Sequence, residues 1–228
     1  MKMMDLWLAM FSSPEQEKFA PELLLSYGGI NGTWTERTET AEKIAEDEGE
    51  YGSGQFWFTN LVSSTTKVRT LNVDLGVEGY IRNAKAKGVK SDAAPSKLQQ
   101  LGYTSLNFRI FGRNIQDSSL ILKGGKYESE FHGSYGKEIS GVMAGAALTI
   151  YLFNWLGGDC NYQRFGDYQK LYSQSQQGEY YDYSLFIEVS LLRLGAGKSS
   201  ETWQVKDDAG SQYDFDHLTK FVYAKLLF

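Results

Sequence analysis

Leu71-Asn-Val-Asp-Leu-Gly-Val-Glu-Gly-Tyr-Ile-Arg82 decides the fold class. Its odd-numbered positions are apolar apart from one glycine, and its even-numbered positions carry every charge in the stretch. A helix would distribute these charges around its circumference, whereas a strand places them all on one face. The stretch therefore predicts a β-strand with one apolar and one polar face.

The same alternation recurs along most of the chain. Apolar side chains occupy alternate positions from 106 to 110, 142 to 152, 185 to 191 and 222 to 228. Ten candidate strands follow, over residues 22–37, 53–63, 67–83, 102–113, 118–131, 139–153, 157–168, 178–194, 199–206 and 217–228. Short connections (63–66, 114–117, 154–158, 195–199) alternate with longer polar ones (38–52, 84–101, 132–138, 170–178, 207–216), which is the asymmetry of outer-membrane barrels.

We therefore predict an all-β fold: an antiparallel up-and-down transmembrane β-barrel of ten strands over residues 21–228. The candidates at 53–63 and 199–206 have the weakest alternation, and an eight-stranded barrel without them is the alternative. An even number of strands places both ends of the barrel on the same side of the membrane, with the longer loops on the other.

The composition excludes several classes of protein. Charged residues make up 22% of the 228 residues and hydrophobic residues 42%, so most of the chain is expected to fold. The net charge of −5 argues against a nucleic-acid partner. The single cysteine excludes an internal disulfide and a multi-cysteine metal site, and the acidic residues at 39–50 lack EF-hand spacing, so we assign no cofactor or metal. No stretch reaches the roughly 18 apolar residues of a membrane-spanning helix.

Residues 1–20 precede the first candidate strand. They combine Lys2 with a short apolar run that Asp5 interrupts, and no small-x-small cleavage site follows. This pattern predicts a mature chain from which the export signal has gone. We interpret residues 1–20 as a periplasmic N-terminal segment that docks on an envelope protein partner or tucks under the barrel.

Alternation alone does not separate a membrane barrel from a soluble sandwich or lipocalin-like barrel, whose apolar face points inward. Long apolar faces and aromatic residues near strand ends favour a membrane barrel with aromatic belts at both interfaces. The aromatic residues are Trp34, Trp57, Tyr80, Phe153, Trp155, Phe165, Tyr180, Tyr181, Tyr183, Trp203 and Tyr213. The alternative, in which these rings pack the core of a sandwich, stays open at this point.

The last residues, Phe221-Val-Tyr-Ala-Lys-Leu-Leu-Phe228, resemble the closing strand of the bacterial outer-membrane β-barrel superfamily. The outward positions Val222, Ala224 and Leu226 and the terminal Phe228 match that pattern, whereas Lys220 departs from a purely apolar run. The resemblance, to small barrels of the OmpA, OmpX and OmpT type, implies that the barrel-assembly machinery reads this strand. It also implies location in the bacterial outer membrane, contact with its lipid and lipopolysaccharide, and termini in the periplasm. No full-length motif assigns the chain to one family.

The polar faces of the predicted strands would line the lumen. They carry a nearly balanced set of charges: Asp74, Glu78, Arg82, Arg109, Arg113, Asp159, Asp182, Glu188 and Lys225. Lys123, Lys126, Glu128 and Glu130 would join them if a bulge at Gly124–Gly125 shifts the alternation. Buried charges are tolerable when they are paired, and only barrels of about 16–18 strands leave a wide aqueous channel. The sequence therefore predicts a charge-filled lumen rather than a general porin.

Two loops of opposite charge are expected on the same side of the barrel. The acidic loop carries Glu39, Glu42, Glu46, Asp47, Glu48 and Glu50, and the basic loop carries Lys85, Lys87, Lys90 and Lys97. They can pair with each other, form solvated surface loops, or form a docking surface for lipopolysaccharide, divalent cations or a protein.

Two histidines lie in short patterns found in outer-membrane enzymes. His132-Gly-Ser134, near Glu138, resembles the histidine–serine spacing of lipid A deacylases, and Asp214-Phe-Asp-His217 resembles the Asp–His pair of omptin proteases. The rest of each family's pattern is absent, and we interpret each histidine as a surface residue in a loop. We therefore predict a non-enzymatic structural or binding component of the envelope, with an outer-membrane hydrolase or a narrow substrate channel as the alternatives.

Overall fold

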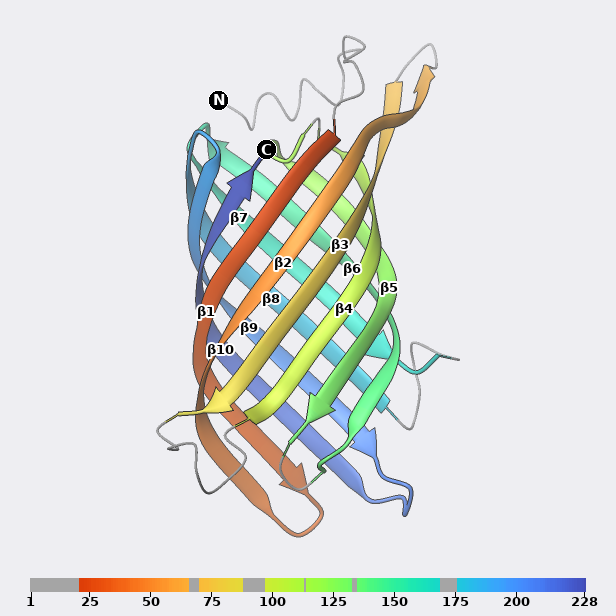
Figure 1. Ribbon diagram of the computed structural model, residues 1–228, viewed down its shortest axis with the longest axis vertical. Coiled ribbons are helices and arrows are strands. Elements are labelled where there is room, and N and C mark those ends of the chain that lie inside the picture. The colour runs from red at the N-terminus through yellow and green to blue at the C-terminus, as the bar shows by residue number, and fades with distance from the viewer. Residues whose placement is uncertain (1–20, 66–69, 88–96, 113, 133–134, 169–175) are drawn as a thin grey trace.

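The computed structural model describes residues 21–65, 70–87, 97–112, 114–132, 135–168 and 176–228, and these form ten antiparallel strands closed into one barrel (Figure 1). The strands are β1 (Pro21–Thr38), β2 (Glu42–Thr65), β3 (Thr70–Ala86), β4 (Lys97–Phe111), β5 (Ser119–Phe131), β6 (Glu138–Phe153), β7 (Leu156–Gly166), β8 (Gln176–Val189), β9 (Leu192–Lys206) and β10 (Gln212–Leu227). None of the described residues forms a helix long and apolar enough to cross a membrane.

Each strand pairs with its neighbours in sequence, and β1 pairs with β10 to close the sheet. This confirms the predicted up-and-down barrel of ten strands, and the eight-stranded alternative is wrong. The start of β1 and the end of β10 lie together at one end of the barrel, which we call the terminal end (Figure 1). The opposite end, where β1 meets β2 and β9 meets β10, is called the hairpin end. The segment predicted at residues 1–20 lies outside the described residues.

Three predicted connections were wrong, and in one of them, 207–216, β10 already begins at Gln212. The acidic segment 38–52 is mostly strand, because β2 begins at Glu42 and pairs with β1 from Arg37↔Glu42 onward. Glutamate has only a weakly unfavourable β-propensity. Here β1 and β3 supply backbone hydrogen-bond partners on both sides of β2. The turn between β8 and β9 falls at residues 190–191 rather than 195–199. Ser190 has a φ of 56°, the left-handed conformation that such a two-residue hairpin turn requires.

The outer and inner faces of the barrel have the opposite polarity to those of a soluble barrel. The outward side chains Leu185 and Val222 are 66% and 62% exposed, whereas the inward Arg109 is 1% exposed. Apolar outward residues continue around the terminal half of the barrel, including Leu25, Phe56, Leu106, Leu122, Ile150, Leu194 and Leu226. Such a surface belongs in lipid, so the barrel is a membrane barrel with a polar lumen.

Outward positions become charged towards the hairpin end. Glu46, Glu48 and Glu50 face outward on β2, as do Lys126, Glu128 and Glu130 on β5. The predicted bulge at Gly124–Gly125 was wrong, because β5 pairs without interruption there with both β4 and β6. Lys123 therefore faces the lumen, and the three charges that follow it face solvent beyond the apolar surface.

The prediction of two aromatic belts was only partly correct. Phe153, Trp155, Tyr181 and Tyr183 do lie on the outer surface. However, Trp34, Trp57, Phe165 and Trp203 are buried inside the barrel. Position near a strand end does not reveal which face a ring occupies, and local polarity does not help where apolar residues run together, as in Phe56-Trp57-Phe58, of which only Trp57 is buried.

Several of the inward rings lie directly over a glycine of the neighbouring strand. Trp203 on β9 is the cross-strand partner of Gly178, and a Cβ atom at Gly178 would lie 2.5 Å from the indole. Phe186 stands in the same relation to Gly157, where the distance is again 2.5 Å. The same arrangement recurs at Trp57–Gly76, Tyr51–Gly28 and Tyr223–Gly195. The missing side chains give these rings the space to lie flat against the inner wall.

We expect Gly178→Ala to destabilise the barrel by about 1–3 kcal/mol, because the new methyl group must displace a buried tryptophan. Urea unfolding in detergent, followed by tryptophan fluorescence, measures the effect. Gly79→Ala is the matched control, since a Cβ at this outward glycine meets no atom within 4 Å. Equal unfolding midpoints for the two variants would contradict the packing argument.

Candidate functional site

The lumen is filled by layers of side chains, and an ionic layer closes it at the terminal end. The guanidinium of Arg109 on β4 lies 2.9 Å from Asp74 of β3 and 2.8 Å from Glu22 of β1. It also lies over the ring of Trp57, 4.5 Å from the centroid. One cation thus neutralises two carboxylates and stacks on an indole, which is the arrangement that makes a buried charge tolerable.

A second cation extends this layer on the opposite side of the lumen. The guanidinium of Arg193 lies 2.9 Å from Glu188 and 4.1 Å from the ring centre of Phe186. Tyr151 donates a hydrogen bond to Glu188 and accepts one from Arg193. Together with the Arg109 cluster, these contacts place paired charges and rings on both sides of the lumen at this end.

A small cavity occupies the middle of the barrel. It has a volume of about 100 Å³ and is lined mainly by polar side chains, including five tyrosines: Tyr51, Tyr80, Tyr103, Tyr180 and Tyr223. Lys123 lies 2.8 Å from Glu78, and Lys225 lies 2.8 Å from Asp159. Asp182 accepts a hydrogen bond of 2.9 Å from the amide of Asn161. A cavity of this size holds a few water molecules and is too small for an ordinary metabolite.

A third charged cluster lies between the cavity and the hairpin end. Arg82 pairs with Glu201, and the amide of Gln99 accepts from Arg82 at 2.6 Å and donates to Glu201 at 3.1 Å. Beside them, Nε2 of His217 lies 2.7 Å from the carboxylate of Asp47. All five side chains are buried, and they come from β2, β3, β4, β9 and β10.

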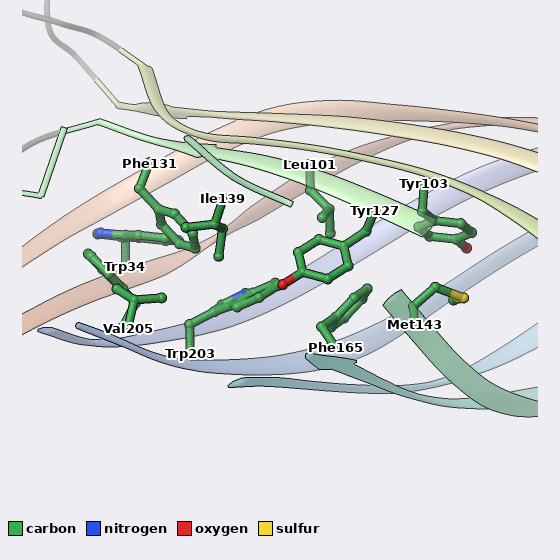
Figure 2. Close-up of a cluster of buried hydrophobic side chains, with 11 residues drawn as sticks. Trp34, Leu101, Tyr103, Tyr127, Phe131, Ile139, Met143, Phe165, Trp203 and Val205 are labelled. Atoms are coloured by element: carbon green, nitrogen blue, oxygen red, sulfur yellow. The ribbon is translucent and has the colours of Figure 1, made fainter. Parts of the chain in front are cut away.

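Rings fill the barrel on the hairpin side of this cluster. Trp34, Tyr127, Phe131, Phe165, Trp203 and Phe215 form what we call the aromatic plug (Figure 2). Phe131 stacks on Phe215 with 4.6 Å between ring centres, and Phe165 stacks on Trp203 at 5.0 Å. Leu101, Ile139, Met143 and Val205 fill the remaining space around the rings. Packing of this kind excludes water from the hairpin end of the lumen.

Two hairpins lie together beyond the aromatic plug. The ring of Tyr135, before β6, contacts that of Tyr213 on β10 with 5.1 Å between centres. Lys137 lies 2.7 Å from Asp208 in the β9–β10 turn, and its hydrogen bond and charge lower the pKa of that carboxyl group. The β5–β6 and β9–β10 turns are therefore held together by a ring contact and an ion pair.

The structure places nearly all of the predicted lumen charges inside the barrel. Asp74, Glu78, Arg82, Arg109, Asp159, Asp182 and Glu188 are buried, and Lys225 is partly buried. Arg113 lies outside the described residues. Sequence reasoning missed Glu22, Asp47, Arg193, Glu201 and His217. The alternation through Arg193, Ser199, Glu201 and Trp203 could have revealed part of this set, had β9 been started at residue 192.

Both histidines were expected to lie in surface loops, and only His217 differs from this expectation. His217 is a residue of β10 and is 1% exposed beneath the aromatic plug, so this prediction was wrong for it. Its sequence neighbour Asp216 faces outward and pairs with Arg37. His132 is partly exposed, with Nε2 3.6 Å from Glu130, while Ser134 lies outside the described residues. Among the described residues, no group of three or more His, Cys, Asp or Glu side chains is arranged to hold a metal ion.

Comparison with known proteins gives likeness of structure only. No family model matches the sequence, and no curated protein matches it. The chain is similar to the outer membrane protease OmpT from Escherichia coli at 12% identity, with 95% of this chain and 100% of that chain covered and a TM-score of 0.47. It is also similar to the translocator domain of the autotransporter NalP from Neisseria meningitidis at 10% identity, with 93% and 90% covered and a TM-score of 0.36. Neither likeness supports the transfer of residues or of an activity to this chain.

We expect Arg109→Met to destabilise the barrel by about 3–5 kcal/mol, because it leaves Asp74 and Glu22 buried without their cation. Arg37→Met is the matched control, since Arg37 also contacts two carboxylates, Glu42 and Asp216, but in solvent. Guanidinium unfolding in detergent should show a large shift for the first variant and almost none for the second. Similar shifts would mean that the terminal layer is not sealed from water.

Proposed function

We propose that this chain is an integral β-barrel of the bacterial outer membrane that serves as a closed structural or binding component of the envelope. The observation that carries the proposal is the filled lumen, with ionic layers on the terminal side of a small cavity and the aromatic plug on its hairpin side. A path for solutes would require the simultaneous loss of several paired charges and packed rings. The hairpin end faces outside and the terminal end faces the periplasm, by analogy with other outer-membrane barrels.

The proposed partners follow from the two ends and the outer surface. Lipid and lipopolysaccharide contact the apolar outer face, and the barrel-assembly machinery reads the last strand during insertion. An envelope protein binds through residues 1–20 or through the charged hairpins. The outward carboxylates on β2 already pair in part with the lysine that follows β3, since Lys87 lies 3.8 Å from Glu46. A larger assembly anchored in this way needs no reaction in the barrel, and His217 is too deeply buried to meet a substrate.

A first test addresses the closed lumen. The purified protein should migrate differently on a gel before and after heating and should require detergent, as inserted barrels do. In planar bilayers we expect no discrete conductance from it. The double variant Trp203→Ala, Phe131→Ala should show no conductance either, because the ionic layers between the plug and the terminal end are intact. Stepwise conductance of the unmodified protein would contradict the proposal and favour the narrow channel.

A second test addresses the last strand. Phe228→Ser should reduce the amount of assembled, heat-modifiable barrel in cells several-fold, because it removes the terminal aromatic from the outward row of Val222, Ala224 and Leu226. Phe153→Ser is the matched control, since Phe153 and Phe228 are outward aromatics of similar exposure, 53% and 57%. Refolded in detergent, the two variants should unfold alike. If both assemble equally well in cells, the last strand is not read as a signal.

A further inference from the structure

A row of four outward side chains crosses β1, β10, β9 and β8. Asn31 is the cross-strand partner of Lys220, Lys220 is the partner of Lys198, and Lys198 is the partner of Tyr183. All four are exposed on the outer surface. Each is a hydrogen-bond donor, and two neighbouring members carry a positive charge.

The two lysines oppose each other without a carboxylate between them. Like charges directly opposite each other destabilise a pair of strands. Among the described residues, neither lysine has an ion-pair partner within 4.0 Å, whereas Arg164 on β7 lies 3.1 Å from its cross-strand partner Glu179 on β8. The next outward residue of the row beyond Asn31 is Glu48, which stands opposite Lys85 of β3.

The surroundings of the lysine pair are apolar. On β10, Lys220 stands between the outward residues Leu218 and Val222, which are 59% and 62% exposed. On β9, Lys198 follows the outward residues Leu194 and Ala196. Lys85 and Lys97 also oppose each other, but they do so near the hairpin end, where water and salt screen their charges. Lys198 and Lys220 therefore stand at the edge of the lipid-facing surface, where an unpaired charge is costly.

We propose that Lys198 and Lys220 together bind a phosphate group of lipopolysaccharide. Neighbouring strands lie about 4.8 Å apart, so two flexible ammonium groups can converge on the oxygens of one phosphate. Asn31 and Tyr183 add neutral donors on either side. Val222, Ala196 and Leu185 form the next row towards the terminal end and supply an apolar surface for the attached acyl chains. The inference rests on the proposed outer-membrane location, in which the hairpin side of the barrel faces the outer leaflet.

The test compares lipid binding by two variants of the full chain in detergent. The probe is bisphosphorylated lipid A, and the complexes are counted by native mass spectrometry. Lys198→Gln combined with Lys220→Gln should bind lipid A about tenfold more weakly than the unmodified barrel, since two charge-assisted contacts are lost. Lys206→Gln is the matched control, because Lys206 is an exposed lysine near the hairpin end of the same strand. Lipid A without its phosphates should bind weakly and equally to all three proteins.

Several results would overturn the inference. One is equal binding of lipid A by the double variant and the Lys206→Gln control. Another is equally strong, lysine-dependent binding of phosphatidylglycerol, because the site would then not select lipopolysaccharide. A dimer that dissociates in the double variant would show instead that a second copy covers this surface. Heat-modifiable migration separates these outcomes from failure of the proposed function, because a chain that is soluble without detergent fails that test before any lipid is added.

A stability measurement gives an independent result. Without lipid, Lys198→Gln should raise the urea midpoint of the barrel, because it removes the repulsion between the two lysines. Added lipid A should raise the midpoint of the unmodified barrel and change that of the variant much less. If lipid A raises both midpoints equally, the lysine pair does not bind its phosphate.

Discussion

The pairing of β1 with β10 is the constraint on which the rest of the structure depends. It runs from Leu24↔Leu227 to Thr38↔Tyr213 and leaves the sheet without an edge. In lipid no water is available to bond an open edge, so an antiparallel sheet can only cross the membrane when it is closed. Closure also fixes which alternate positions face outward. From that point every inward side chain must find its partner within the lumen of a ten-stranded barrel, which is narrow.

The composition of the inner wall follows from this narrow space. Charges such as Arg109 are too close to other walls of the barrel to remain hydrated, so they pair with carboxylates on other strands and stack on rings. Rings as large as Trp57 and Trp203 fit only because the strand beside each one has a glycine opposite. The inward rings and the glycines opposite them therefore belong to one packing arrangement.

Local patterns predicted the strands, and non-local pairings limited the prediction of the site. The alternation around Asp74 and Glu78 was enough to place both in the lumen, because it depends only on neighbouring residues. The partner of Arg109 from β1, Glu22, could not be predicted, since contacts across a barrel depend on the stagger of all its strands. His217 was misplaced for a related reason: Asp214-Phe-Asp-His217 resembles a polar loop, yet β9 and β1 hold it as a strand.

The outer surface around the aromatic plug is charged. Towards the hairpin end the outward positions carry Glu46, Glu48, Glu128 and Glu130, so this part of the barrel stands in water. Lipid contributes nothing to its stability there, and the hydrophobic effect can act only on the inside. Rings gather inside this part of the barrel, where they cover the buried cluster of Asp47, Arg82, Glu201 and His217 and add apolar burial that the charged outer surface does not provide. Burial of the aromatic plug therefore stabilises the part of the barrel whose outward positions are charged.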